Sequence, residues 1–216
     1  MLGIIQSFVL GIACAIAFSY AWHRPPANLA SQNVIGQLPS ISTTNDLDVK
    51  YLHQEDLLCV PTSASMIMAF YGDRHSPRKL KTMSRGIEYS PSKPFDDFTI
   101  TYYRDIIRAG RALGYDWHEQ IFEDNDFGFR RGLAIVKDEL GRRHPVMIDL
   151  SMPEGHTIVI IGFDERMQAI NVVDPNASAP GRYSISYDDL QTMWNEHAFN
   201  GNFRSLVTTS PRKRSF

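Results

Sequence analysis

Three short runs rich in β-branched residues lie close together in the second half of the chain, and they constrain the fold more than any other feature. They are Pro-Val-Met-Ile-Asp-Leu at 145–150, Thr-Ile-Val-Ile-Ile-Gly-Phe at 157–163 and Ala-Ile-Asn-Val-Val at 169–173. Pro, Gly, Asp and Arg separate the runs, and short apolar runs bounded by such residues are typical of β-strands. We therefore predict a three-stranded antiparallel meander.

The chain before these runs has the spacing of helices. Between residues 60 and 71, apolar side chains recur on one helical face, Pro61 suits a first turn and Gly72 suits a C-terminal stop. Further helices are predicted within 99–114, 129–140 and 186–194, the last with Ser186 as its N-cap. Helices first and an antiparallel sheet second give an α+β fold class.

Cys59 directly precedes the first of these helices and is the only cysteine after residue 21. Cysteine attacks as the thiolate, and a helix N-terminus together with a nearby imidazolium stabilises that anion. The alternative is an inert cysteine that packs as a small apolar side chain. Since Cys59 has no second thiol in the domain, an intramolecular disulfide there is excluded.

A base for Cys59 has to come from one of seven histidines. His156 follows Gly155 at the start of the most apolar strand, where a rigid backbone can orient the ring, although such a histidine can also be an ordinary packed residue. Asp174 ends the next strand, and in an antiparallel hairpin the start of one strand lies beside the end of the next. We predict that His156 and Asp174 are close; Asp174-Pro175-Asn176 also reads as a turn.

Gln54 lies shortly before Cys59, so the connecting loop can return its amide to the helix start. A side-chain amide and the backbone N–H of the nucleophile can together stabilise an oxyanion. A single glutamine is weak evidence, because most glutamines lie on the surface. The ordered set of Gln, Cys, His and Asp is stronger.

The segments around these residues resemble the double-glycine leader (bacteriocin-processing) peptidases and their stand-alone relatives, which form family 39 of the papain-like cysteine peptidases. The resemblance rests on Tyr-Leu-His-Gln-Glu-Asp-Leu-Leu-Cys-Val-Pro-Thr-Ser-Ala-Ser-Met at 51–66, His-Pro-Val-Met-Ile-Asp-Leu at 144–150, Gly-His-Thr-Ile-Val-Ile-Ile-Gly-Phe at 155–163 and Val-Asp-Pro at 173–175.

The resemblance implies a papain-like fold and no metal or cofactor. It implies that Cys59 is the nucleophile, His156 the general base and acid, Asp174 the orienting residue and Gln54 the oxyanion donor. Val60 follows the cysteine where the family often has glycine, and a β-branched side chain there narrows the approach of a substrate. The sequence contains no transporter domain, so peptide-bond cleavage is implied but double-glycine leader processing is not.

The first 23 residues are predicted to be a signal peptide or a membrane anchor. Residues 2–21 carry no charged side chain and have about the length, roughly 20 residues, that spans a bilayer as a helix; a helix buried in the core is the alternative. We expect a linker at 24–48, a peptidase domain at 49–210 and a basic tail at 211–216. The domain is then exported, periplasmic or extracellular, or membrane-anchored.

The predicted function is thiol-dependent hydrolysis of a peptide or isopeptide bond in a peptide or protein substrate. Acyl transfer to an amine uses the same intermediate and stays open. A membrane-tethered, non-catalytic peptide-binding module on the same fold is the alternative from another class. Nucleic acid is not an expected partner, because a formal net charge of −2 gives no field that would gather a polyanion.

Overall fold

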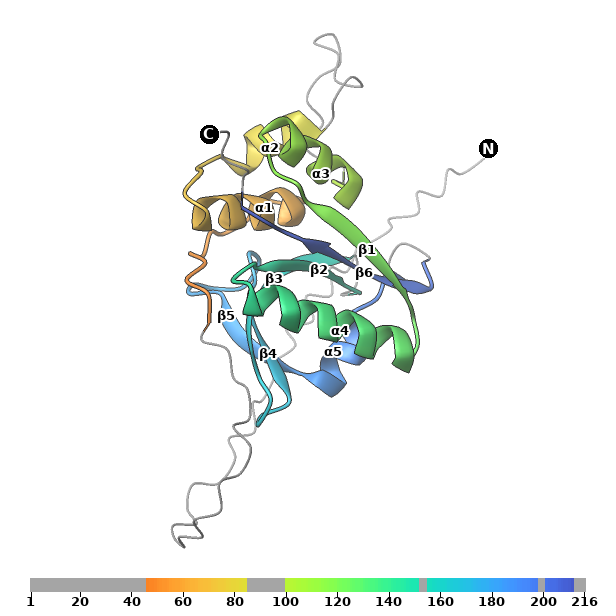
Figure 1. Ribbon diagram of the computed structural model, residues 1–216. Helices are drawn as coiled ribbons and strands as arrows, with labels where there is room; N and C mark the ends of the chain where they lie inside the picture. Colours follow the sequence, from red (N-terminus) through yellow and green to blue (C-terminus); the bar gives the residue numbers. More distant parts are fainter. Residues whose placement is uncertain (1–45, 85–99, 152–154, 198–200, 212–216) are drawn as a thin grey trace, which may run out of the picture. The chain divides into compact units, whose positions relative to one another are not determined.

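The fold is built on an antiparallel sheet of six strands in the order β1-β6-β2-β3-β4-β5 (Figure 1). The computed structural model describes residues 46–84, 100–151, 155–197 and 201–211. The strands are β1 His118–Glu123, β2 Val146–Leu150, β3 His156–Asp164, β4 Ala169–Val173, β5 Arg182–Ser186 and β6 Phe203–Thr208.

The predicted meander is confirmed as β2, β3 and β4, and the α+β class is confirmed with it. The prediction of helices first and sheet second is too simple, because β1 precedes helix α4 and β6 follows helix α5. Strand β6, the last in the chain, lies between the edge strand β1 and β2. Its partners are distant in sequence, so local patterns do not reveal the pairing.

Five helices accompany the sheet in the described residues: α1 Cys59–Phe70, α2 Pro77–Ser84, α3 Tyr103–Ala112, α4 Asp126–Gly141 and α5 Tyr187–Met193. The helix α2 was not predicted. Two of the expected helix ends are present: Gly72 has φ +96° just after α1, and the hydroxyl of Ser186 accepts the N–H of Asp189 at 3.1 Å at the start of α5. Helix α1 packs on β3, whereas α4 crosses the sheet against β1, β3 and β6 (Figure 1).

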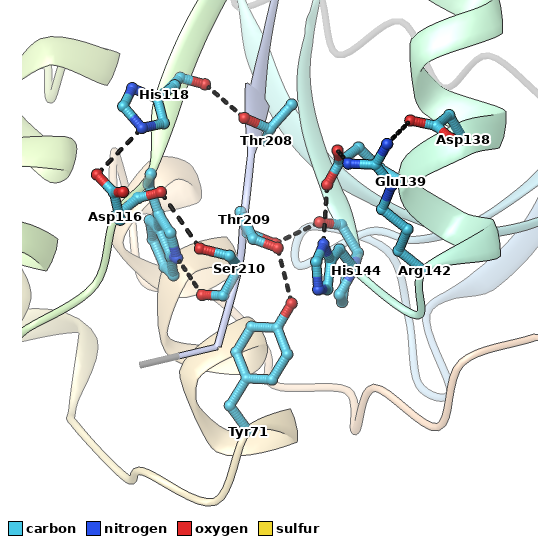
Figure 2. A network of polar contacts seen from close by, with 12 residues as sticks. Tyr71, Asp116, His118, Asp138, Glu139, Arg142, His144, Thr208, Thr209 and Ser210 are labelled. Atoms are coloured by element: carbon cyan, nitrogen blue, oxygen red, sulfur yellow. Dashed lines mark hydrogen bonds and ion pairs between the residues drawn. The ribbon is translucent and has the colours of Figure 1, made fainter. Parts of the chain in front are cut away.

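A network of polar contacts holds the segment that follows β6 (Figure 2). The Tyr71 hydroxyl donates to the carbonyl of Thr209 at 2.8 Å, and the Trp117 indole N–H donates to the carbonyl of Ser210 at 3.1 Å. The Thr209 hydroxyl donates to the carbonyl of Pro145. Tyr71 follows the last residue of α1, so the network joins the end of β6 to the helix that begins with Cys59.

The two ends of the chain lie mostly outside the described residues. The predicted membrane segment 1–23, the linker up to residue 45 and the tail after residue 211 are among these parts. From residue 46 the chain is part of the fold, because Leu47 is buried and its N–H donates to the carbonyl of Ile161 at 2.8 Å. Within the described ranges, no helix combines the length and apolar character needed to cross a membrane.

Candidate active site

Cys59 is the first residue of α1 and is a free, half-buried cysteine. It lies in the wall of a cavity of about 560 Å³, a volume within the range of ligand sites. The other three predicted site residues, Gln54, His156 and Asp174, line the same cavity. Since the N–H groups of a first helical turn have no acceptor within the helix, the backbone at Cys59 offers donors to an anion.

The predicted proximity of His156 and Asp174 is confirmed. His156 begins β3 and Asp174 directly follows β4, and the antiparallel pairing of these strands brings the two together. The Nε2 of His156 donates to Oδ1 of Asp174 at 2.6 Å. The other ring nitrogen is left for Cys59, whose hydrogen bond with the imidazole contributes to the histidine's raised pKa.

Asp174 is held by two more donors. The backbone N–H of Asn176 donates to its Oδ1 at 2.7 Å, and the hydroxyl of Tyr183 donates to its Oδ2 at 2.9 Å. Both side chains of the His156–Asp174 pair are largely buried, at 13% and 12% exposed, so solvent screens their interaction little. The carboxylate is therefore fixed in position beside the imidazole.

The pKa shifts of the pair favour its charged form. Burial alone would lower the pKa of His156, but hydrogen bonds with Asp174 and Cys59 outweigh it and raise the pKa to about 9. Burial alone would raise the pKa of Asp174, but the hydrogen bond and charge of His156, with the donors from Asn176 and Tyr183, lower it. At neutral pH the ring of His156 therefore carries a proton that it can transfer to a leaving group.

Gln54 reaches the cavity from a loop that the structure ties to the Asp174 turn. Its backbone N–H donates to the carbonyl of Pro175 at 2.9 Å. Its side-chain oxygen is buried and has no hydrogen-bond partner among the described residues, so the amide is not engaged elsewhere through that atom. In the same loop Leu57 has φ +59°, a left-handed conformation that costs a non-glycine residue about 1–2 kcal/mol.

Several residues in and around the site were not predicted from the sequence. Tyr183, which holds Asp174, lies in β5, whose alternating Arg-Tyr-Ser-Ile-Ser pattern after a Pro-Gly turn could have been recognised as a strand. Asp149 stands out in sequence as a carboxylate inside an apolar strand. Tyr103, Glu119 and Glu196 also line the cavity, and no local pattern marks them, because they come from three separate segments.

The helix that begins with Cys59 and the six-stranded antiparallel sheet form the papain-like fold of C39 peptidase domains. A family model described as the Peptidase_C39 like family matches residues 46–205, and the chain belongs to this family. No curated protein gives a match.

Two solved structures show the same fold. The peptidase domain of Streptococcus ComA, a bi-functional ABC transporter involved in a quorum sensing pathway, aligns with a TM-score of 0.54 at 16% identity, over 76% of this chain and 99% of that chain. A double glycine motif protease from an AMS/PCAT transporter, in complex with the leader peptide, aligns with a TM-score of 0.50 at 16% identity, over 76% of this chain and 94% of that chain.

Proposed function

We propose that this domain hydrolyses a peptide or isopeptide bond through an acyl-enzyme on Cys59. The observation that carries the proposal is the cavity that Cys59, at a helix N-terminus, shares with the hydrogen-bonded pair of His156 and Asp174. Nucleophile, proton carrier and orienting carboxylate are the three parts that thiol-based acyl transfer needs.

In the first half of the reaction, the sulfur of Cys59 attacks the carbonyl carbon and the carbonyl oxygen takes the negative charge. The amide of Gln54 and the backbone N–H of Cys59 are the proposed donors to that oxygen. The C–N bond then breaks, and the proton of His156 goes to the departing nitrogen. The products are a free amine and a thioester on Cys59.

In the second half, neutral His156 takes a proton from water while the water oxygen attacks the thioester. The C–S bond breaks, the acid product leaves, and the sulfur returns as the thiolate beside protonated His156. Asp174 keeps the ring in one orientation through both halves, because its bond to Nε2 leaves only the other nitrogen for proton transfer.

A peptide substrate is supported by the rim of the cavity. Leu57, Ile100 and Tyr102 are exposed at 39%, 47% and 49%, and all three line the cavity. Exposed apolar side chains gathered at one opening are typical of a binding surface. A structural neighbour was solved with its leader peptide, which supports a peptide as the substrate class here.

A thiol-directed activity probe tests the proposed nucleophile and base. We expect the probe to label the wild-type protein, to leave Cys59→Ala unlabelled and to label His156→Ala much more weakly. Cys14→Ala is the matched control, because it removes the chain's other cysteine and should keep full labelling at Cys59. Equal labelling of wild type and His156→Ala would remove His156 from the proposed role.

Substrate profiling then tests hydrolysis itself. Peptides from a complex digest are incubated with the wild-type protein or with Cys59→Ala, and new termini are identified by mass spectrometry. We expect new termini with the wild type alone. Added amine nucleophiles separate hydrolysis from acyl transfer, since a transacylase would give amine conjugates in place of free acids.

We also propose that residues 1–23 direct export or hold the domain at a membrane, on the strength of the uncharged run at 2–21. Cell fractionation of the full chain and of a chain without residues 1–23 tests this proposal. The full chain should be found in a membrane or exported fraction and the shortened chain in neither. N-terminal sequencing of the recovered protein distinguishes a cleaved signal from a retained anchor.

A further inference from the structure

Acidic side chains gather in the cavity that holds Cys59 and His156. Asp149 at the end of β2, Glu196 after α5 and Glu119 on β1 all belong to the cavity wall. The proposed reaction uses none of the three. Because they lie in the same cavity as the nucleophile, we ask whether they bind part of the substrate or stabilise the fold.

Asp149 lies on β2, the strand that pairs with the start of β3 where His156 lies. The β2–β3 register pairs it with Thr157, the residue after His156, and the Thr157 hydroxyl donates to its carboxylate. Protein surrounds the carboxyl group, but it keeps some accessible surface because it faces the cavity. Burial and then the charge of Glu196 raise the pKa of Asp149 to about 7.

Glu196 and Glu119 extend this negative region away from Asp149. Glu196 is buried, and its carboxylate accepts a hydrogen bond from the Ser205 hydroxyl at 2.5 Å. Glu119 is exposed on the outer strand of the sheet. Partial burial and the charge of Glu196 raise the pKa of Glu119, so these two carboxylates also act on each other.

Tyr103 is a further polar group of this wall whose hydrogen bonds are incomplete. It lines the cavity, is 5% exposed, and its buried hydroxyl lies beside Asp149 without a hydrogen bond of normal geometry to any described residue. The hydroxyl lies in the field of Asp149 and Glu196, because after burial these two acids contribute most to raising its pKa well above the usual value. A buried hydroxyl without a partner is costly unless a bound group completes its hydrogen bonds.

The protonated ring of His156 lies near enough to Asp149 to lower its pKa, but no described lysine or arginine forms an ion pair with Asp149 or Glu196. Arg104 lines the cavity and its charge lowers the pKa of Glu119. Its side chain is largely exposed, and its guanidinium lies 4.9 Å from the centre of the Tyr102 ring. A divalent metal is not favoured, since no group of three or more metal-ligating side chains occurs among the described residues.

We propose that Asp149, Glu196, Glu119 and Tyr103 form a subsite for the side chain of a lysine or arginine close to the scissile bond. The proposal rests on the proposed peptidase function and names the class of substrate. The cation donates to the carboxylates, and Tyr103 can accept from it or donate to a carboxylate. The aliphatic stem of the basic side chain suits the apolar rim, because lysine and arginine bury their stems while the charged end reaches polar groups.

Matched peptides provide the test. A cleaved sequence from the substrate profiling is made with lysine or with norleucine at the enriched position, so that the two differ in the ammonium group. We expect wild-type kcat/KM to be about tenfold or more higher for lysine, the effect of one hydrogen bond to a charged group. In Asp149→Asn and Glu119→Gln this ratio should fall toward one, while Asp138→Asn, an exposed carboxylate on α4 outside the cavity wall, should keep it.

Glu119→Lys keeps the test decisive if Asp149→Asn fails to fold, because Glu119 is exposed. This variant should turn the preference from lysine to norleucine. Equal cleavage of both peptides by the wild type, or an unchanged ratio in Glu119→Lys, overturns the subsite while the peptidase function stands. If the wild type cleaves no peptide in the profiling, the proposed function fails and the subsite fails with it.

Discussion

At the scale of single residues, Asp174 links most of the chemistry of the site. One carboxylate accepts hydrogen bonds from the His156 ring, the Asn176 backbone and the Tyr183 hydroxyl. Each donor stabilises the ionised carboxylate, and that charge in turn keeps His156 protonated. The site's response to pH should therefore depend on this one residue.

Asp174→Asn should lower the pH above which activity is lost. The pKa of His156 is raised from 6.5 to about 9, so the stabilisation from its charged form is complete below about pH 6.5 and is lost as pH rises through about 9. Removing an adjacent opposite charge shifts a pKa by about 1–3 pH units. The pH profile of kcat/KM should show its alkaline limb near pH 9 in the wild type and at lower pH in the variant. Coinciding limbs would contradict the assignment of that limb to His156.

Tyr183→Phe tests a positioning role at the other oxygen of Asp174. The loss of one hydrogen bond to a charged group, roughly 1.5–3 kcal/mol before solvent screening, should raise the pKa of Asp174. The acidic limb of the pH profile should move up by about one pH unit and the alkaline limb should stay. Tyr187→Phe is the control, because Tyr187 lies beside Lys137 and Glu165 and makes no contact with Asp174 in the described residues. A uniform loss of activity with both limbs unmoved would indicate a structural role only.

At the scale of elements, the sequence predicted what short-range patterns determine. Helix α1 with Cys59 at its start and the β3–β4 hairpin with its His156–Asp174 pair depend on periodicity, caps and turns within about 20 residues. Strand β6 depends on pairing with β1 and β2, which are far away in the chain. The candidate nucleophile, base and orienting acid could therefore be predicted, and the wall formed by Tyr103, Glu119 and Glu196 could not.

The turn between β4 and β5 fixes Asp174 through one glycine. Gly181 has φ +66°, its carbonyl accepts the N–H of Asp174 at 2.8 Å, and a Cβ there would overlap the ring of Tyr51. Gly181→Ala should therefore cost about 1–3 kcal/mol of stability and lower kcat/KM by disturbing Asp174. Thermal unfolding and peptide turnover measure both effects.

Gly141→Ala is the control for Gly181→Ala. Gly141 ends helix α4 and a Cβ there meets no atom within 4 Å. This change should leave activity unaltered and should be neutral or stabilising by up to about 1 kcal/mol. Equal stability of the two alanine variants would show that the Gly181 turn does not need its left-handed conformation.

At the scale of the whole molecule, the fold holds two acids, Asp149 and Glu196, in its interior beside the site. Burial is the largest cause of the raised pKa of both. A carboxyl group whose pKa is raised in the folded state lowers the stability of the fold at pH values above its ordinary pKa. In that range the unfolded chain releases the proton more easily than the folded chain does. Global stability is thus linked to the same residues that we propose for recognition.

Asp149→Asn should reveal how much stability the ionisation of Asp149 costs the folded protein. The folded-state pKa of Asp149 is about 7 against an ordinary 3.8, so between these values the folded state holds more protons than the unfolded state. As pH rises through this range, the ionisation of Asp149 should lower the free energy of unfolding of the wild type by about 1.4 kcal/mol per pH unit. The isosteric amide of Asp149→Asn should remove this pH dependence. Chemical denaturation at about pH 5 and about pH 8 should show the variant gaining on the order of 2–3 kcal/mol relative to wild type at the higher pH. Parallel pH profiles would mean that Asp149 titrates alike in the folded and unfolded chains, and the carboxyl group would then be free of the burial and the Glu196 charge that the structure assigns to it.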